Sequence, residues 1–105
     1  MSTTACLGCG ATLDVDGKPG PAASLTGGLC GDAFTESWFR CGACDRYTVE
    51  VHRDAFLGEA TVSWRGPVAR AEGDRTVELI RGCPEPWDKA CRCPAHRTYF
   101  EGALD

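Results

Sequence analysis

The chain has 105 residues, of which 11 are basic and 15 acidic, so its formal net charge is −4 at pH 7. This length suits one domain, or one domain with a small metal module. The negative charge disfavours nucleic-acid binding, because proteins that bind phosphate backbones usually present a basic face. Thirteen glycines and six prolines interrupt the apolar residues. We therefore expect a modest core that needs metal or disulfide cross-links.

Residues 1–6 contain neither a basic region nor an apolar run, so we expect no signal peptide. No stretch approaches the length of a transmembrane helix, and we expect no membrane partner. These features favour a cytoplasmic protein. Thiols stay reduced in that compartment, so regularly spaced cysteines indicate metal ligands, with disulfides as the alternative.

A Cys-x-x-Cys pair occurs twice and supplies four candidate metal ligands: Cys6, Cys9, Cys41 and Cys44. Each pair forms a knuckle that needs a tight turn, so that backbone N–H groups can point at the sulfurs. Gly10, Gly42 and Asp45 permit such turns. Two facing knuckles place four sulfurs in a tetrahedron, the closed coordination of structural zinc. The spacing therefore predicts one Zn²⁺ at this first site.

The segment between the knuckles begins with a candidate strand, Ala11 to Val15, and a turn over residues 16–20. Residues 17–31 are rich in Gly, Pro, Ala and Ser, which predicts a mobile loop. Cys30 lies in this loop and is expected to be a free thiol, although it could replace Cys83 in the second site described below. Residues 34–39 contain aromatic and β-forming residues and predict a strand.

The second knuckle leads into an alternating pattern in which Tyr47, Val49 and Val51 share one face. Residues 53–58 predict a turn and residues 60–64 a second strand, which together make a β-hairpin. Glu50 and His52 lie on the polar face of the first strand. A solvated role is expected for both, because loops and clefts carry most catalytic chemistry.

Two cysteine knuckles joined to a small antiparallel sheet resemble the zinc-ribbon class. The resemblance covers roughly the first two-thirds of the chain and rests on the knuckles. It implies the same four cysteine ligands, although residues 10–40 form a longer spacer than is usual in such sites. Zinc ribbons serve transcription, translation, enzyme complexes and protein assembly, so the class alone implies no single function.

Residues 70–73 read as a polar loop, after which Asp74 can cap a helix over residues 75–81. Val77 and Ile80 would face inward, and Gly82 stands where a helix ends. A short strand through Val77 and Leu79 is the competing interpretation. We favour the helix.

The C-terminal region concentrates four further candidate ligands: Cys83, Cys91, Cys93 and His96. Residues two apart on an extended backbone point the same way, so Cys91 and Cys93 can reach one ion. Pro94 suits the first position of a helical turn, which would bring His96 back to that point. The pattern predicts a Cys₃His zinc site. The alternatives are buried, ligand-free cysteines beside a hydrogen-bonded His96, or a Cys91–Cys93 redox pair.

No catalytic residues are predicted. Four thiolates close the first site, and no catalytic triad, phosphate-binding glycine loop or nucleotide fingerprint occurs. Trp87 stands on a loop stiffened by Pro84 and Pro86. It is expected to act either as a lid over the second metal or as an anchor for a partner. Arg81, Lys89, Arg92 and Arg97 would compensate thiolate charge or, in the nucleic-acid alternative, contact phosphates.

The predicted fold class is small, metal-stabilised and mostly β: a zinc-ribbon-like antiparallel sheet, an irregular Cys/His-rich C-terminal segment and one short helix. Residues 1–66 form the zinc-ribbon-like module and residues 67–105 the C-terminal segment, within one compact domain. We expect a non-enzymatic adaptor or accessory subunit that binds two Zn²⁺ ions and a protein partner. The alternatives are rubredoxin-like electron transfer with iron at the first site, and a nucleic-acid-binding zinc ribbon.

Overall fold

The computed structural model describes residues 3–14, 21–29, 31–55 and 58–100. Within these residues the chain forms six strands and two helices. In chain order they are β1 (Thr3–Ala5), β2 (Thr12–Asp14), β3 (Ala23–Leu29), β4 (Asp32–Arg40), β5 (Tyr47–Asp54), β6 (Thr61–Val68), α1 (Arg70–Arg81) and α2 (Pro94–Tyr99).

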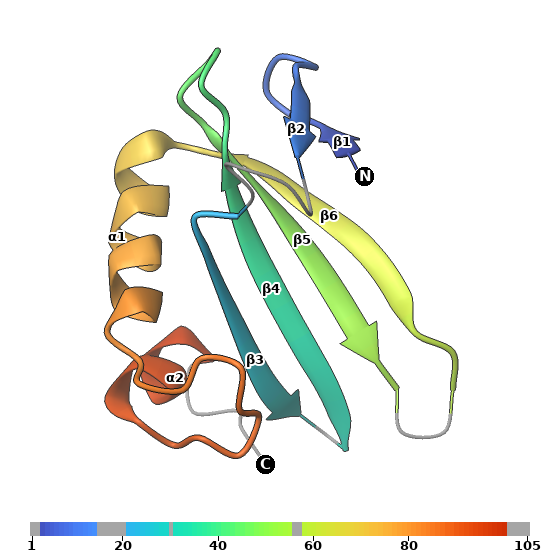
Figure 1. Cartoon of the computed structure of the whole chain (residues 1–105), viewed down its shortest axis with the longest axis vertical. Helices are drawn as coiled ribbons and strands as arrows, with labels where there is room; N and C mark the ends of the chain where they lie inside the picture. The colour runs from blue at the N-terminus through green and yellow to red at the C-terminus, as the bar shows by residue number, and fades with distance from the viewer. Residues whose placement is uncertain (1–2, 15–20, 30, 56–57, 101–105) are drawn as a thin grey trace.

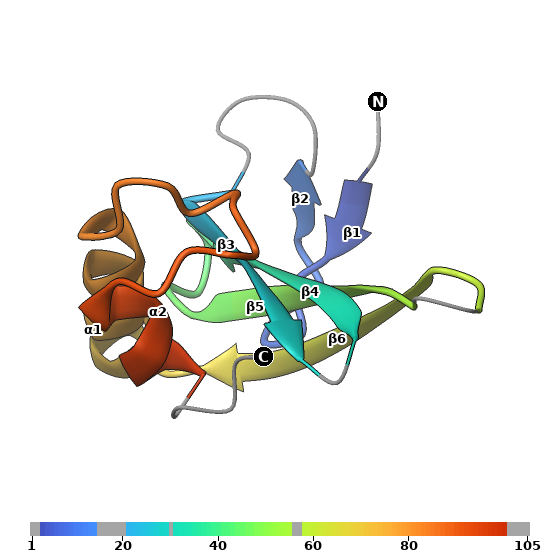
Figure 2. The same ribbon diagram turned by 90° about the horizontal axis from the view of Figure 1, so that it is seen from below.

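The strands form two antiparallel sheets. β1 pairs with β2, and the larger sheet has the order β3-β4-β5-β6, in which neighbours in sequence are neighbours in space (Figure 1). Helices α1 and α2 lie on the same side of the molecule, and the β1–β2 pair stands apart from them (Figure 2). Consecutive residues of a strand point to opposite faces. Trp38 accordingly packs with the helices, while Phe39 packs with Leu13 of β2.

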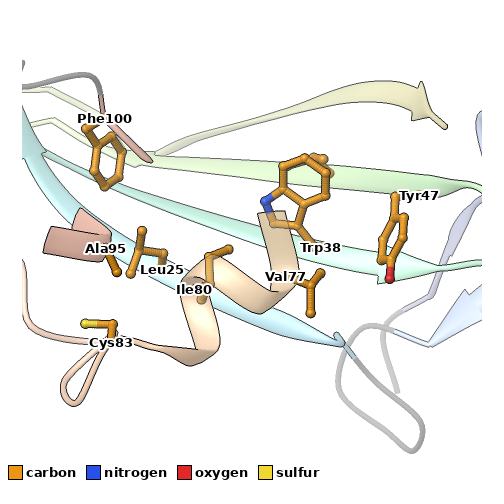
Figure 3. Packing of buried hydrophobic residues seen from close by; sticks show 9 residues of the cluster. Leu25, Trp38, Tyr47, Val77, Ile80, Cys83, Ala95 and Phe100 are labelled. Atoms are coloured by element: carbon orange, nitrogen blue, oxygen red, sulfur yellow. The ribbon is translucent and has the colours of Figure 1, made fainter. Parts of the chain in front are cut away.

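The main core lies between the large sheet and the helices (Figure 3). Leu25 of β3, Trp38 of β4 and Val49 of β5 pack there with Val77 and Ile80 of α1. This core unites residues from both predicted segments, 1–66 and 67–105. No helix among the described residues is long and apolar enough to cross a membrane.

The mostly β, antiparallel fold class is confirmed. The predicted strand over residues 34–39 lies inside β4, and the predicted hairpin corresponds to β5 and β6. β5 continues to Asp54 and β6 begins at Thr61, so the connection between these strands lies two residues further along the chain than the predicted turn over residues 53–58. β2 confirms the strand predicted from residue 11, whereas Val15 and the turn over residues 16–20 lie outside the described residues.

The prediction of a loop over residues 17–31 is wrong for its second half. Residues 23–29 form β3, which pairs with β4 along its whole length. In this pairing Gly27 lies opposite Phe34 and Gly28 lies opposite Ala33. Leu25 is fully buried in the main core. Strand pairing and this burial outweigh the low β propensity of glycine. Cys30 lies outside the described residues.

The helix predicted over residues 75–81 is confirmed, but its predicted start is wrong. α1 begins at Arg70, and the polar sequence 70–73 is its first turn. Gly73 faces the core, where an added Cβ would come within 2.6 Å of Tyr47 Cε2. Asp74 does not cap the helix; its carboxylate accepts a 2.6 Å hydrogen bond from the Tyr47 hydroxyl. Gly73 is therefore explained by helix–sheet packing, which the local sequence does not reveal.

Candidate metal centres

The first cluster is built from two turns of the same design. Each begins directly after a strand, β1 or β4, and each ends with a residue at positive φ: Gly10 at 80° and Asp45 at 59°. Gly10 N–H donates to the Cys6 carbonyl over 2.8 Å, and Asp45 N–H donates to the Cys41 carbonyl over 2.9 Å. The left-handed conformation that each turn requires is available to Gly and, less easily, to Asp. The predicted turn chemistry is thus present at Gly10 and Asp45, whereas Gly42 has no positive φ and room for a Cβ.

The four sulfurs of this cluster lie within 4.8 Å of one another. The Sγ atoms of Cys6 and Cys44 are 3.6 Å apart, as are those of Cys9 and Cys41. A tetrahedron with Zn–S bonds of about 2.3 Å has S···S edges of about 3.8 Å. The donor set and its spacing therefore fit one tetrahedral metal ion. Cys6 and Cys41 are buried, whereas Cys9 is exposed.

Backbone groups and neighbouring thiols shift the pKa values of the thiols in this cluster in opposite directions. Burial opposes ionisation of Cys6, but the backbone N–H groups of Cys9 and Gly8 lower its pKa to about 6. At Cys44 the backbone N–H of Arg46 favours the thiolate, yet desolvation and the adjacent thiols raise its pKa to about 12. One thiol ionises readily and its neighbour resists. A bound cation would remove this conflict, because it favours all four thiolates together.

The second cluster forms where α1 ends and α2 begins. Cys83 follows Gly82 at the end of α1, and Cys93 is the N-cap of α2. Pro94 occupies the first turn of α2, as predicted, and His96 N–H donates to Cys93 Sγ over 3.4 Å. The short helix thereby returns His96 to the cysteine that precedes it.

The second cluster also has metal-ligand spacing. Cys83 Sγ lies 3.8 Å from Cys91 Sγ and 3.4 Å from Cys93 Sγ. His96 Nδ1 lies 3.1 Å from Cys83 Sγ and 3.4 Å from Cys93 Sγ. Tetrahedral zinc, with Zn–S near 2.3 Å and Zn–N near 2.0–2.1 Å, gives S···N edges of about 3.6 Å. Three sulfurs and one imidazole nitrogen thus surround a single point.

A backbone carbonyl on β3 orients the histidine ring. His96 Nε2 lies 2.9 Å from the carbonyl oxygen of Thr26, and the His96 side chain is fully buried. Because a carbonyl only accepts, Nε2 carries the proton, which leaves the Nδ1 lone pair facing the three sulfurs. Metal-bound histidines are commonly held this way. The role of Thr26 has no sequence signal, since a main-chain oxygen 70 residues away supplies the contact.

The thiols of the second cluster show the same uneven acidity. Burial and the adjacent Cys93 raise the pKa of Cys83 to about 12. Burial also opposes ionisation of Cys93, but the backbone N–H and the ring of His96 lower its pKa to about 6.

The other candidate residues lie elsewhere. Trp87 is 71% exposed on the loop between α1 and α2. Arg81 and Arg92 donate hydrogen bonds to backbone carbonyls, those of Ala22 and Lys89 respectively. His52 and Glu50 are half-buried on β5, on the sheet face turned away from the main core.

No protein-family model, curated protein or solved structure matches the chain. The two clusters, set in a mostly antiparallel β chain, fit a zinc-ribbon-like class. Each cluster could hold one metal ion, and each already offers four donors. Such closed donor sets are typical of structural sites, because a catalytic metal keeps a position open for water or substrate.

Proposed function

We propose that the protein is a non-catalytic, zinc-binding adaptor or accessory subunit that presents a rigid surface to a protein partner. The observation that carries this proposal is the pair of complete four-donor clusters. Cys6, Cys9, Cys41 and Cys44 would hold one ion, and Cys83, Cys91, Cys93 and His96 the other. Zn²⁺ in such sites supplies a fixed tetrahedral cross-link.

The loop between Cys83 and Cys91 is the proposed partner-binding element. Both of its ends belong to the second cluster, and Pro86 C=O accepts a 2.7 Å hydrogen bond from Thr26 N–H of β3. Trp87 follows immediately and is 71% exposed. An exposed tryptophan on a loop fixed at both ends can anchor a partner with little loss of conformational entropy. This favours the anchor over a lid that closes on the metal.

Metal analysis tests the first half of the proposal. Protein purified without added metal is expected to contain two Zn per chain by elemental analysis, because the two donor sets are separate. Cys91→Ser should reduce this to one, and Ser63→Ala, which changes an exposed residue outside both clusters, should leave it at two. A content of one Zn per chain in the unmodified protein would refute metal binding at the second cluster.

Iron in place of zinc would favour the second candidate, rubredoxin-like electron transfer at the first site. One observation supports that candidate: Cys9 is exposed and so brings a ligand sulfur to the surface. An iron site in four thiolates would colour the protein, and the colour should change on reduction.

Partner capture tests the second half. Trp87→Ala should keep both metals and the near-UV circular dichroism spectrum but lose the partner on purification from the native host. Truncating a central aromatic anchor typically costs about 2 kcal/mol or more of binding free energy. Arg75→Ala is the control, since it truncates an exposed side chain on α1, outside the loop and both clusters. Retention of every partner by Trp87→Ala would refute the anchor. A salt-sensitive complex with labelled oligonucleotides would instead favour the nucleic-acid alternative.

A further inference from the structure

The two edges of the large sheet differ in how far other parts of the chain cover them. At the β3 edge, Thr26 N–H donates to Pro86 C=O and Thr26 C=O accepts from His96, so the chain itself covers the middle of this edge. At the other edge, no described strand pairs with the outer side of β6, which borders the sheet on the side away from α1 (Figure 1). An open edge strand presents backbone donors and acceptors to another chain.

Over half its length, the open edge lacks the charged residues and prolines that usually prevent pairing with another strand. Seven of the eight residues of β6 are exposed. Charge and proline, which usually prevent edge pairing, appear only in its second half, at Arg65 and Pro67. The first half, Thr61 to Trp64, is uncharged and rich in β-forming residues. Val62 is 52% exposed and Trp64 37% exposed.

We infer that β6 pairs with β6 of a second copy of this chain, which joins two four-stranded sheets into one antiparallel sheet. The sequence of the strand is self-complementary about Ser63. With Ser63 opposite Ser63 on a two-fold axis, Val62 of each copy opposes Trp64 of the other, and Thr61 opposes Arg65. Aromatic residues paired with β-branched residues are among the stabilising cross-strand combinations, and no like charges meet in this register.

The two apolar side chains lie on a common face of the sheet. Val62 pairs with His52 and Trp64 pairs with Glu50, both on the face turned away from the main core. Trp64 also contacts the Phe39 ring, with 6.5 Å between centroids. In the two-fold pair, Val62 and Trp64 of each copy would therefore meet on that face and extend the small apolar cluster around Phe39. An isologous contact of this kind closes on itself as a dimer.

The pairing region is short, so we expect a reversible dimer whose population rises with protein concentration. The net charge of −4 on each copy opposes association, and salt screens that repulsion. Raising the salt concentration should therefore increase the dimer fraction. An interface held by ion pairs would respond in the opposite direction.

Sedimentation velocity on the full metal-bound chain tests the pairing and its register. Ser63→Lys and Ser63→Glu each place like charges face to face on the two-fold axis. Each should weaken the dimer by up to about fivefold, the order expected for one opposed cross-strand pair. An equimolar mixture of the two variants should restore the dimer, because Lys then opposes Glu. Ala71→Lys, at an exposed site on α1, is the charge-matched control and should dimerise like the unmodified protein.

Three results would overturn the inference: a monomer at every concentration and salt level, a dimer indifferent to both Ser63 variants, or two folded variants that fail to pair on mixing. Near-UV circular dichroism establishes that the variants are folded. Ser63→Lys reduces the negative net charge, so its dissociation could not be explained by overall repulsion. Trp87→Ala should leave the dimer unchanged, which separates this surface from the proposed partner anchor.

Discussion

At the scale of single residues, the contact between Tyr47 and Asp74 ties the large sheet to α1. The Tyr47 hydroxyl donates a 2.6 Å hydrogen bond to the Asp74 carboxylate. This bond, aided by the nearby charge of Arg70, holds the pKa of Asp74 below its ordinary value. A depressed carboxyl pKa contributes stability above the unfolded-state pKa, near 4, and that stability is lost as the pH falls through the folded-state value.

Tyr47→Phe should therefore raise the pKa of Asp74 toward its ordinary value. It should also weaken the dependence of folding stability on pH below about 4. A carboxyl-carbon NMR titration measures the first effect, and urea unfolding at a series of pH values measures the second. Tyr99→Phe removes a phenol that bonds to Glu36 instead and serves as the control. An unchanged Asp74 titration in Tyr47→Phe would show that another group depresses this pKa.

Single residues also show what local sequence can and cannot reveal. Seven of the eight candidate ligands follow from short spacings, and Pro94 correctly predicts the turn that returns His96 to Cys93. Thr26 contributes through its backbone, so no side chain identifies it. Asp74 resembles a helix cap in sequence, but its carboxylate is engaged by a tyrosine 27 residues away.

At the scale of elements, α1 depends on a glycine at its contact with the sheet. An added Cβ at Gly73 would overlap the Tyr47 ring. Gly73→Ala should gain about 1 kcal/mol of helix propensity but lose about 1–3 kcal/mol through overpacking, for a net decrease in unfolding free energy. Urea denaturation measures this change. Arg75→Ala, at an exposed position of the same helix, should stay within about 0.5 kcal/mol of the unmodified protein.

Strand prediction succeeded where the local sequence pattern indicates a strand, and it failed where pairing with a neighbouring strand determines the conformation. The sequence of β5 alternates apolar and polar residues, as a half-buried strand requires, and its position was predictable. β3 contains two glycines and no such pattern. Its conformation depends on β4 and on the burial of Leu25, which are tertiary effects.

At the scale of the whole molecule, the two clusters lie at different junctions: the first joins the β1–β2 pair to the large sheet, and the second lies where α1 and α2 meet within the main core. The knuckles lie at one end of the large sheet and α2 lies near the other end (Figure 1). The first cluster connects the β1–β2 pair to β4 and β5. A small apolar group around Phe39 and a 3.1 Å hydrogen bond from Leu7 N–H to Thr48 Oγ1 support the same junction. Metal binding at such a site contributes directly to folding, on the order of 10 kcal/mol for structural zinc.

Cys41→Ser should therefore yield a largely unfolded or insoluble protein. Near-UV circular dichroism and thermal melting measure the loss. Gly42→Ala is the matched control within the same knuckle, because a Cβ there meets nothing within 4 Å and the four sulfurs remain. A Cys41→Ser protein with a native spectrum and an unchanged melting temperature would mean that the first cluster does not hold the fold together.

The hydrogen bonds to Thr26 have a consequence for the state of the protein when metal is scarce. They cover the β3 border of the sheet, and both come from the segment that the second cluster organises. If a chelator or an oxidant emptied that cluster, Pro86 and His96 would lose this support, and the backbone groups of Thr26 would become available to another chain. A molecule with one unpaired sheet edge can only form dimers by strand pairing, whereas a molecule with two unpaired edges can add copies without limit. The second cluster would then protect against fibre growth in addition to fixing the loop between Cys83 and Cys91.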